Sequence, residues 1–345
     1  MSNPLRVGLI GYGYAGKTFH APLIHATPGL SLVAVASSRP ADVIADWPDV
    51  AVKTEPAALI TRPDLDLVVI ATPNDTHAPL ARAALAAGKH VVVDKPFTLS
   101  VAEADALVVT AREMNRVLSI FHNRRWDADF LALRQLMADG ALGRVTLLQS
   151  RFDRYRPAVR QRWREGGGPG GGLWFDLGPH LVDQALQLFG MPQMVSADLA
   201  IRRDGGVAVD DALVVLHYPT QRVELGASML VSGGTARFVA HGTAASFEVH
   251  GLDNQEDQLK AGLTPADPDW GRDPRTGTLH RWTDDAPHAD PVILPRGDYP
   301  AYYAGVRDAL LGLAPNPVSG EEASAVMRVI EAAIRSAQRR AQVRP

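Results

Sequence analysis

A histidine and two carboxylates lie at helical spacing near the middle of the chain. Asp176, His180 and Asp183 stand at positions i, i+4 and i+7, and residues at this spacing share one face of a helix. Histidine is the side chain best suited to proton transfer near neutral pH, and a carboxylate four residues away can orient its ring and tune its proton affinity. The spacing therefore indicates acid–base chemistry on one helix face.

A lysine with a restricted backbone lies upstream of this cluster. Lys95 follows the apolar run at 90–94 and precedes Pro96, and a residue before proline is held in an extended backbone. A single surface lysine is normally a solubilising charge. At the carboxyl end of a strand in a parallel sheet, where ligands bind, we favour a lysine that orients a substrate or takes part in catalysis.

The elements that position these groups begin with a glycine-rich turn. An apolar strand at 5–10 runs directly into Gly11, Gly13 and Gly16, which fit the pattern G-x-G-x-x-G, and a helix is predicted from there on. The first glycine allows the tight turn, the second leaves room for a pyrophosphate, and the third lets helix and strand pack closely. A strand, this turn and a helix in direct succession predict a dinucleotide-binding site.

Polar residues after the next strand indicate which dinucleotide binds. Ser37, Ser38 and Arg39 follow the strand at 31–37, and no acidic residue occurs until Asp42. NAD sites usually carry an acid here for the ribose 2′-hydroxyl, whereas arginine and small hydroxyl residues accommodate the 2′-phosphate of NADP. We therefore expect NADP. The alternative is that Arg39 is a solvated loop residue and the site accepts NAD as well.

The loop at 72–77 follows the strand at 66–71. We expect it to lie beside the cofactor phosphates and ribose, because ligands in such sheets bind at the carboxyl ends of the strands. Asn74 or Thr76 can also cap the following helix. Both roles are compatible.

Two other interpretations of the Asp176–His180 cluster stay open. Aspartate and histidine bind metal ions, but only two or three such ligands lie close together and the chain has no cysteine, so we expect no metal. Alternatively, His180 satisfies a buried polar contact and does nothing more. Proton transfer is favoured because the cluster follows a predicted cofactor site and a well-placed lysine.

Strand and helix candidates alternate over the first third of the chain. Strands are predicted at 5–10, 31–37, 66–71, 90–94 and 116–121, and helices around 16–26, 76–87 and 100–114. Several strands are continuous apolar runs, as expected for strands buried on both faces. The alternation predicts an α/β fold with a parallel doubly wound sheet over residues 1–122.

The rest of the chain, residues 123–345, has a different period. A helix at 127–139 precedes strands at 144–154, 193–202, 210–218, 221–230, 235–241 and 245–250, and helices return at 299–312 and 320–340. These adjacent strands predict an α+β domain with a large, mostly antiparallel open sheet, an irregular surface excursion at 252–297 and a last helix that packs back on the body. An open sheet face often packs on a second copy, so we expect a homodimer or homotetramer.

Composition narrows the class of protein. The formal net charge of −3 gives no reason to expect nucleic acid or an anionic membrane as a partner. The longest apolar runs are too short to span a bilayer, and the N-terminus has no signal-peptide pattern. The absence of cysteine excludes disulfides and fits a reducing compartment. We therefore expect a soluble, cytoplasmic protein.

Four motifs are spread over nearly the whole chain. They are Gly-Tyr-Gly-Tyr-Ala-Gly at 11–16, Ala-Thr-Pro-Asn at 71–74, Asp-Lys-Pro at 94–96 and Gly-Gly-x-x-x-Asp-x-Gly-x-His-x-x-Asp at 171–183. Together they resemble the glucose–fructose oxidoreductase, inositol dehydrogenase and rhizopine-catabolism (Gfo/Idh/MocA) family, which usually has Glu-Lys-Pro where this chain has Asp94. Stretches at 121–126, 153–157 and 162–165 are similar to an NADP-dependent scyllo-inositol dehydrogenase subgroup.

The resemblance implies a Rossmann domain at 1–122, a substrate-binding and oligomerisation domain at 123–345, and an NAD(P)-dependent dehydrogenase or reductase acting on CH–OH groups. It also implies that Lys95, Asp176 and His180 form the catalytic group. His180 would exchange the hydroxyl proton, and Lys95 would stabilise charge on the reacting oxygen. Asp176 would bind a substrate hydroxyl or support the proton relay.

Two residue sets complete the predicted site. The cofactor-binding residues are expected in the glycine turn and in the loops after the strands, namely Gly11, Tyr12, Gly13, Tyr14, Ala15, Gly16, Ser38, Arg39, Thr72, Pro73, Asn74, His77, Asp94, Lys95, Pro96 and Asn123.

The substrate is expected to be a cyclic polyol or sugar, or its ketone, because aromatic faces and fixed donors suit a ring with many hydroxyls. Its contacts are expected from Lys95, Asn123, Arg125, Tyr155, Trp163, Arg164, Trp174, Asp176 and His180. The arginines could instead only pair with carboxylates.

Two alternatives to a polyol dehydrogenase stay open. The first is a non-enzymatic dinucleotide-binding redox sensor, which could dispense with a catalytic group, whereas this chain keeps Lys95, Asp176 and His180. The second is a dehydrogenase of the same family with another substrate, such as a trans-dihydrodiol or a bilin.

Overall fold

The computed structural model describes residues 3–345, apart from the side chain of Trp163. The chain forms two compact units. Unit 1 runs to Asn123 and also contains Asn254–Gly271 and Asp298–Ser324, and unit 2 consists of Arg124–Asp253, Arg272–Gly297 and Ala325–Pro345. The division into contiguous domains after residue 122 stays a prediction.

Unit 1 contains a six-stranded parallel sheet, here sheet A. Its strands are β1 (Leu5–Ile10), β2 (Leu30–Ala36), β3 (Ala51–Lys53), β4 (Leu67–Ile70), β5 (His90–Val93) and β6 (Leu118–Ile120). They are ordered β3-β2-β1-β4-β5-β6, and every neighbouring pair is parallel. This is the strand order of a Rossmann fold. Strands β1 to β3 are added toward one edge of the sheet and β4 to β6 toward the other, so the order in which strands are added reverses between β1 and β4. The predicted parallel doubly wound sheet is confirmed.

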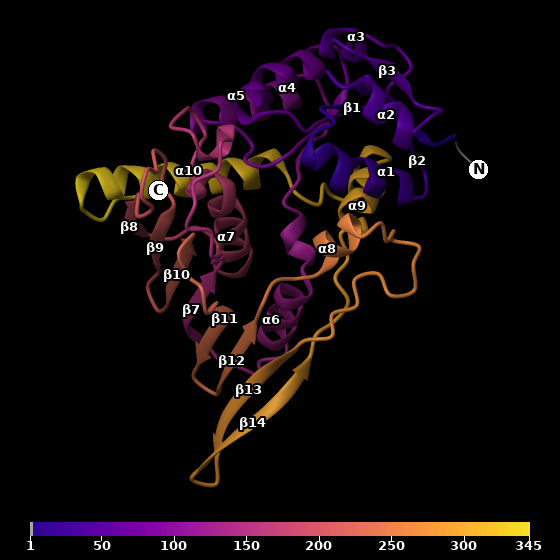
Figure 1. Ribbon diagram of the computed structural model, residues 1–345. Helices are drawn as coiled ribbons and strands as arrows, with labels where there is room; N and C mark the ends of the chain where they lie inside the picture. Colours follow the sequence, from indigo (N-terminus) through magenta and orange to yellow (C-terminus); the bar gives the residue numbers. More distant parts are fainter. Residues whose placement is uncertain (1–2) are drawn as a thin grey trace. The chain divides into compact units, whose positions relative to one another are not determined.

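Unit 1 also contains helical segments, several of which pack on this sheet. They are η1 (Gly16–His20), α1 (Ala21–Ala26), α2 (Pro40–Asp46), α3 (Pro56–Ile60), η2 (Asn74–Thr76), α4 (His77–Ala86), α5 (Val101–Glu113), α8 (Gln255–Lys260) and α9 (Pro300–Leu310). In Figure 1, α4 and α5 run side by side, and α4 packs on β4 and β5. The predicted helix at 16–26 is a π-helical turn that continues into α1. β3, α2 and α3 were not predicted, because elements of three to seven residues carry too little periodicity.

Unit 2 contains an eight-stranded sheet, here sheet B, in the order β14-β13-β12-β11-β7-β10-β9-β8. Its strands are β7 (Val145–Arg151), β8 (Met194–Ala200), β9 (Asp211–His217), β10 (Arg222–Ser228), β11 (Ala236–Gly242), β12 (Ala245–His250), β13 (Thr276–Thr283) and β14 (Ala286–Ile293). Only the neighbours β7 and β10 are parallel. The predicted large, mostly antiparallel sheet is confirmed, as is the predicted hairpin of β9 and β10.

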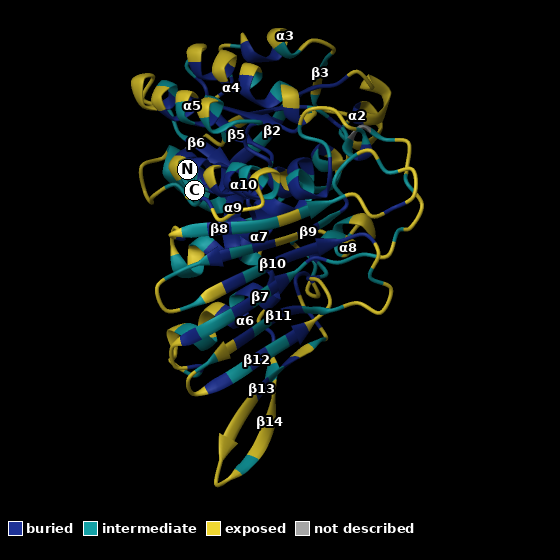
Figure 2. Ribbon diagram, turned by 90° about the vertical axis from the view of Figure 1, so that its left-hand side faces the viewer, coloured by how far each residue is buried: buried dark blue, intermediate teal, exposed yellow. Residues whose placement is uncertain are grey.

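Helices lie on one face of sheet B. They are α6 (Ala128–Ala138), α7 (Leu173–Phe189) and the larger part of α10 (Gly320–Arg339), with short 3₁₀ turns at η3 (Asn123–Trp126) and η4 (Trp163–Glu165). α7 packs on β9 and β10, and Figure 2 shows the opposite face of the sheet turned toward the viewer. The α7 residue Trp174 donates from its indole nitrogen to the Ile330 carbonyl oxygen of α10 at 3.2 Å. A Cβ at Gly178 would lie 2.7 Å from the Trp174 ring, so glycine allows this close packing.

The prediction of an irregular excursion at 252–297 was wrong. This region contains α8 and the hairpin of β13 and β14, which is mostly exposed. Only Gly277 and Leu279 of the hairpin are buried, and the rest of both strands shows no alternation of buried and exposed residues, so the period of two that marks a strand is too short to detect. Pro287 and Pro291 also argue against a strand, but β14 is the edge of sheet B, where proline is tolerated.

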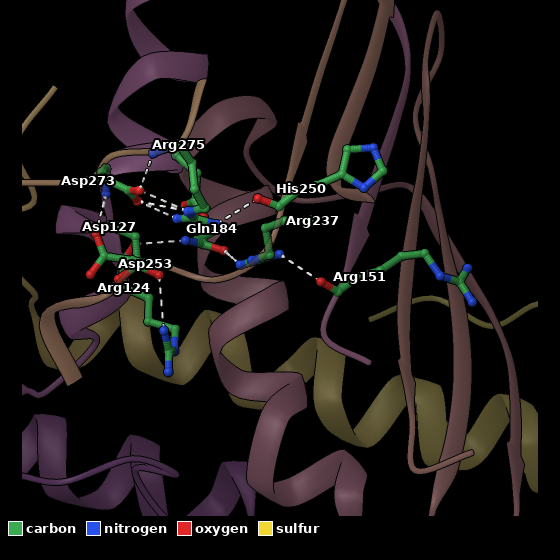
Figure 3. Close-up of polar contacts among 11 residues, drawn as sticks. Arg124, Asp127, Arg151, Gln184, Arg237, His250, Asp253, Asp273 and Arg275 are labelled. Atoms are coloured by element: carbon green, nitrogen blue, oxygen red, sulfur yellow. Dashed lines mark hydrogen bonds and ion pairs between the residues drawn. The ribbon is translucent and has the colours of Figure 1, made fainter. Parts of the chain in front are cut away.

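Buried charged groups gather near the start of α6 in unit 2 (Figure 3). Arg237 donates to Gln184 Oε1 at 2.5 Å and to Ser150 Oγ at 2.7 Å, and the Gln184 amide donates to the Arg124 carbonyl oxygen at 2.7 Å. These contacts tie α7 to β7 and β11 through polar groups that are buried. The network therefore holds helix and sheet together without relying on apolar packing alone.

Asp129 is the carboxylate of this region that is least well satisfied. It is fully buried, and among the described residues neither of its carboxylate oxygens has a hydrogen-bond partner. Arg275 Nη2 lies 3.9 Å away. Burial raises the pKa of Asp129 to about 6, with Asp253 adding to the shift and Arg237 and Arg275 opposing it. The charged form is therefore disfavoured in the folded state.

We expect Asp129→Asn to raise the free energy of unfolding by about 2 kcal/mol at about pH 8. A carboxyl whose pKa is higher in the folded than in the unfolded state favours folding only while it is protonated. The wild type therefore loses stability as the pH rises from about 4 through 6, whereas asparagine does not titrate. Urea unfolding at several pH values measures the difference, which should shrink as the pH falls.

The neighbouring Asp127 supplies a matched control. Its carboxylate accepts from Arg124 Nη1 at 3.1 Å, so Asp127→Asn should lower the stability by breaking a buried pair. If Asp129→Asn destabilised the protein as much as Asp127→Asn at about pH 8, the claim that the charged form of Asp129 destabilises the folded protein would be disproved.

Candidate active site

The glycine turn after β1 has the geometry that the motif requires. Gly11 has a φ of 97°, and a Cβ there would lie 2.4 Å from the Ala71 carbonyl oxygen. A Cβ on Gly16 would lie 2.1 Å from the Gly11 carbonyl oxygen. By contrast, a Cβ on Gly13 would meet no atom within 4 Å. Two glycines are thus needed by the backbone itself, and the third faces open space.

A cavity of about 350 Å³ adjoins this turn at the carboxyl ends of β1, β2 and β4. Its volume lies in the range of small-molecule and cofactor sites. It is lined by Ile10, Gly11, Tyr12, Gly13, Ala36, Ser37, Ser38, Arg39, Thr54, Pro56, Ala71, Thr72 and Pro73. Thr54 and Pro56 were missed because they follow β3, which was too short to predict, and the strand-end residues Ile10, Ala36 and Ala71 were not predicted to bind the cofactor either.

The residues of this cavity fit a dinucleotide. The open side of Gly13 leaves the backbone accessible to a pyrophosphate, and the cavity lies where the strand order of sheet A reverses. In such sheets dinucleotides bind at this reversal. The glycine turn would hold the pyrophosphate, and residues 37–39 would face the adenosine ribose.

Arg39 reaches back to the glycine turn. Its Nη2 donates to the Tyr12 carbonyl oxygen at 2.7 Å, its Nε lies 3.5 Å from Asp42, and its side chain is 60% exposed. The Tyr12 hydroxyl donates to Asp46 at 2.8 Å, and burial, followed by this hydrogen bond, raises the pKa of Tyr12. The guanidinium is thus held at the cavity rim beside Ser37 and Ser38, and the part of it that faces solvent can meet a phosphate.

The loop at 72–77 is tied to the end of β5 by a histidine. The fully buried His77 ring has Nδ1 2.8 Å from the Pro96 carbonyl oxygen and Nε2 3.0 Å from the Thr72 carbonyl oxygen. Burial lowers its pKa. The Thr76 hydroxyl bonds to Pro73 O and Thr72 Oγ, and its side chain does not cap α4. His77 therefore joins the two loops, and its part in cofactor binding stays a prediction.

Lys95 directly follows β5 through the buried Asp94. Asp94 Oδ1 accepts from the Lys95 backbone N–H at 2.8 Å. Burial alone would raise the pKa of Asp94, but the nearby His20 ring, together with Lys95 and His77, lowers it to about 2. An ionised carboxylate thus lies next to the lysine and fixes its backbone.

The predicted helix face exists on α7. Asp176 is in its first turn, with a carboxylate oxygen 3.7 Å from Arg154 Nη1, and the His180 side chain is buried. Asp183 accepts hydrogen bonds from Arg125, at 3.0 Å from Nε and 2.7 Å from Nη2. Asp183 is therefore engaged with Arg125, whose role as a substrate contact stays a prediction. Arg154 was not among the predicted residues, because no spacing in the sequence links it to α7.

The other predicted substrate contacts have different surroundings. Asn123 is buried, Tyr155 is exposed, and Arg164 lines a small hollow beside Asp176 in unit 2. Trp174 is buried with its indole bonded to α10. The side chain of Trp163 lies outside the described residues. Lys95 belongs to unit 1, and Asp176 and His180 belong to unit 2, so their joint action stays a prediction.

The described part of the chain has neither a cluster of metal-binding side chains nor a membrane-spanning helix. Within residues 3–345, no three histidine, aspartate or glutamate side chains gather in a way that could hold a metal ion. The same residues form no helix that is long and apolar enough to cross a membrane.

Comparison with family models decides the membership of the chain. The model of an oxidoreductase family's NAD-binding Rossmann fold matches residues 5–122, and the model of its C-terminal alpha/beta domain matches residues 134–344. The chain belongs to the Gfo/Idh/MocA oxidoreductase family. It is accordingly an NAD(P)-dependent oxidoreductase.

Individual relatives within this family cover nearly the whole chain. The uncharacterized oxidoreductase YdgJ of Escherichia coli (strain K12) is 52% identical over 99% of both chains. The scyllo-inositol 2-dehydrogenase (NADP(+)) IolW of Bacillus subtilis (strain 168) is 36% identical over 97% of this chain and 94% of its own. The solved structure of YPO2259 from Yersinia pestis has a TM-score of 0.96 at 52% identity, covering 100% of this chain and 98% of that one.

Proposed function

We propose that this Gfo/Idh/MocA enzyme transfers a hydride between NADP and a ring carbon of a cyclic polyol, such as scyllo-inositol, or its ketone. The similarity to IolW over 97% of the chain carries the choice of substrate. Arg39 at the rim of the cofactor cavity, with no acid beside it before Asp42, supports NADP.

The catalytic group in this proposal is Lys95, Asp176 and His180. A bound nicotinamide supplies the carbon that accepts or returns the hydride. His180 takes the hydroxyl proton on a ring nitrogen during oxidation and returns it during reduction. Lys95 donates from Nζ to the reacting oxygen and stabilises its developing negative charge. Asp176 binds a hydroxyl of the substrate, beside the Arg154 guanidinium.

The open face of sheet B supports a further part of the proposal, namely that the enzyme forms a homodimer or homotetramer. The helices of unit 2 cover the other face, and an uncovered sheet face commonly meets a second copy. Gel filtration with light scattering measures the mass in solution. A monomer at micromolar concentration would contradict this part.

A substrate screen tests the function. Inositol isomers, their ketones and common sugars are each paired with NAD and NADP, and the absorbance of the reduced nicotinamide is followed. The proposal expects turnover with NADP and a cyclitol or its ketone. Tight NADP binding without turnover of any of these compounds would instead support a redox sensor, and turnover of a trans-dihydrodiol alone would move the enzyme to another substrate.

We expect Arg39→Ala to raise the Kd of NADP by about 30-fold and that of NAD by less than about threefold, because only NADP has a 2′-phosphate for charge-assisted hydrogen bonds. Quenching of tryptophan fluorescence measures both constants. Arg112→Ala is the matched control, since Arg112 is also an exposed arginine paired with a carboxylate, Glu321, and does not line the cofactor cavity. Equal weakening of NAD and NADP by Arg39→Ala would refute the assignment.

A further inference from the structure

A series of buried polar side chains leads from α9 to Lys95, all within unit 1. The Tyr303 hydroxyl lies 2.6 Å from His20 Nδ1, and His20 Nε2 lies 3.8 Å from Asp94 Oδ1. The same Asp94 oxygen accepts from the Lys95 backbone N–H at 2.8 Å. Tyr303 and His20 are fully buried, and Asp94 is 7% exposed. The family motifs do not explain why three polar side chains are kept together here.

We take the Tyr303 hydroxyl to be the donor at the start of this series. Burial raises the pKa of Tyr303 well above its usual value, so its hydroxyl keeps its proton. When that hydroxyl donates to Nδ1, the ring proton of a neutral His20 is on Nε2, which faces Asp94. Among the described residues, Nε2 has no hydrogen-bond partner, and 3.8 Å is longer than a hydrogen bond. The interaction with Asp94 is therefore an electrostatic attraction between two buried groups that do not form a hydrogen bond.

We propose that Tyr303 and His20 are positioning residues for Lys95. Tyr303 fixes the tautomer of His20, His20 presents its N–H to the Asp94 carboxylate, and Asp94 fixes the backbone of Lys95 at the end of β5. The ring of Phe121 packs on His20, with the two ring centroids 4.4 Å apart. The inference rests on the proposed function only in taking Lys95 to be catalytic.

The neighbouring tyrosine of α9 offers a matched control. Tyr302 is also fully buried, and its hydroxyl lies 2.9 Å from Ser119 Oγ, outside the series. Tyr302→Phe and Tyr303→Phe each remove one buried hydroxyl one residue apart and leave the ring in place. A difference in kcat between the two variants is thus due to the Tyr303–His20–Asp94 contacts and not to the packing of α9.

The kinetic test compares kcat of the two variants. Tyr303→Phe should lower kcat by about 5- to 10-fold with the KM of NADP within about twofold of wild type, as expected for the loss of one hydrogen bond. Tyr302→Phe should leave kcat within about twofold. His20→Gln, which keeps an N–H donor near the position of Nε2, should retain several-fold more activity than His20→Ala. Equal kcat values for the two tyrosine variants would overturn the proposal.

A second measurement needs no substrate. In ¹⁵N NMR of the wild type, the His20 ring should be the Nε2–H tautomer, and the backbone amide signal of Lys95 should shift in Tyr303→Phe and stay in place in Tyr302→Phe. An Nδ1–H tautomer, or a Lys95 amide that responds equally to both variants, would overturn the positioning role. If the wild type turned over none of the screened compounds, the proposed function would fail, and the NMR result alone would decide the inference.

Discussion

Replacing Lys95 with methionine is expected to lower kcat by about 1000-fold while the Kd of NADP stays within about threefold of wild type. The expected loss is that of a donor to a developing oxyanion, for which factors of about 10² to 10³ are typical. Methionine keeps an unbranched chain without the charge, so the backbone beside Asp94 should be preserved. Stopped-flow or steady-state absorbance of reduced nicotinamide measures kcat, and fluorescence quenching measures cofactor affinity.

The same substitution at Lys89 separates catalysis from stability. Lys89 is buried, and its Nζ donates to the Arg62 and Leu65 carbonyl oxygens at 2.7 and 2.9 Å. Lys89→Met should therefore lower the melting temperature without lowering kcat of the folded enzyme. If Lys95→Met lost NADP affinity in parallel with kcat, Lys95 would be a cofactor ligand and its catalytic role would be rejected.

His180→Ala is expected to lower kcat by about 100- to 10,000-fold, the usual contribution of a positioned acid–base group. The side chain is buried in α7, so the cofactor affinity of unit 1 should not change. Because alanine has no group that exchanges a proton, the residual rate should lose the limb of the pH profile that His180 provides. Steady-state rates across a pH series measure both effects.

His217→Ala is the control for His180→Ala. It removes a half-buried histidine of the same unit, whose Nε2 lies 2.8 Å from Ser196 Oγ on β8. It should leave kcat within about twofold. A His180→Ala variant that kept wild-type kcat and its full pH profile would return His180 to the role of a buried structural residue.

The sequence was most informative where the residues of a single strand or turn are enough to predict its structure. The apolar runs of β4 and β5 predicted a parallel sheet because strands covered on both faces must be apolar throughout. Gly11, Gly13 and Arg39 line one cavity, because both the glycine turn and Arg39 directly follow predicted strands. β3 was missed because it is short, and the hairpin of β13 and β14 was misjudged because it is mostly exposed and too few of its residues are buried to impose a period.

Contacts between segments that are distant along the chain could not be predicted from the sequence. Asp183 stands at the predicted helical spacing, but its hydrogen bonds from Arg125 depend on how α7 packs. Likewise, 283 residues separate His20 from Tyr303, and no pattern along the chain joins them. Spacing indicates which side chains share a helix face, whereas tertiary packing decides which of them have partners.

The two prolines of β14 have a consequence for how sheet B can meet other chains. Pro287 and Pro291 are four residues apart and both pair with β13, so their nitrogens face the same, outer side of the edge strand. Neither can donate a hydrogen bond, and the outer edge thus lacks two of the amides that an added strand would need. Edge-to-edge pairing of this strand with a strand of another chain is therefore disfavoured, and sheet B does not extend beyond its eight strands.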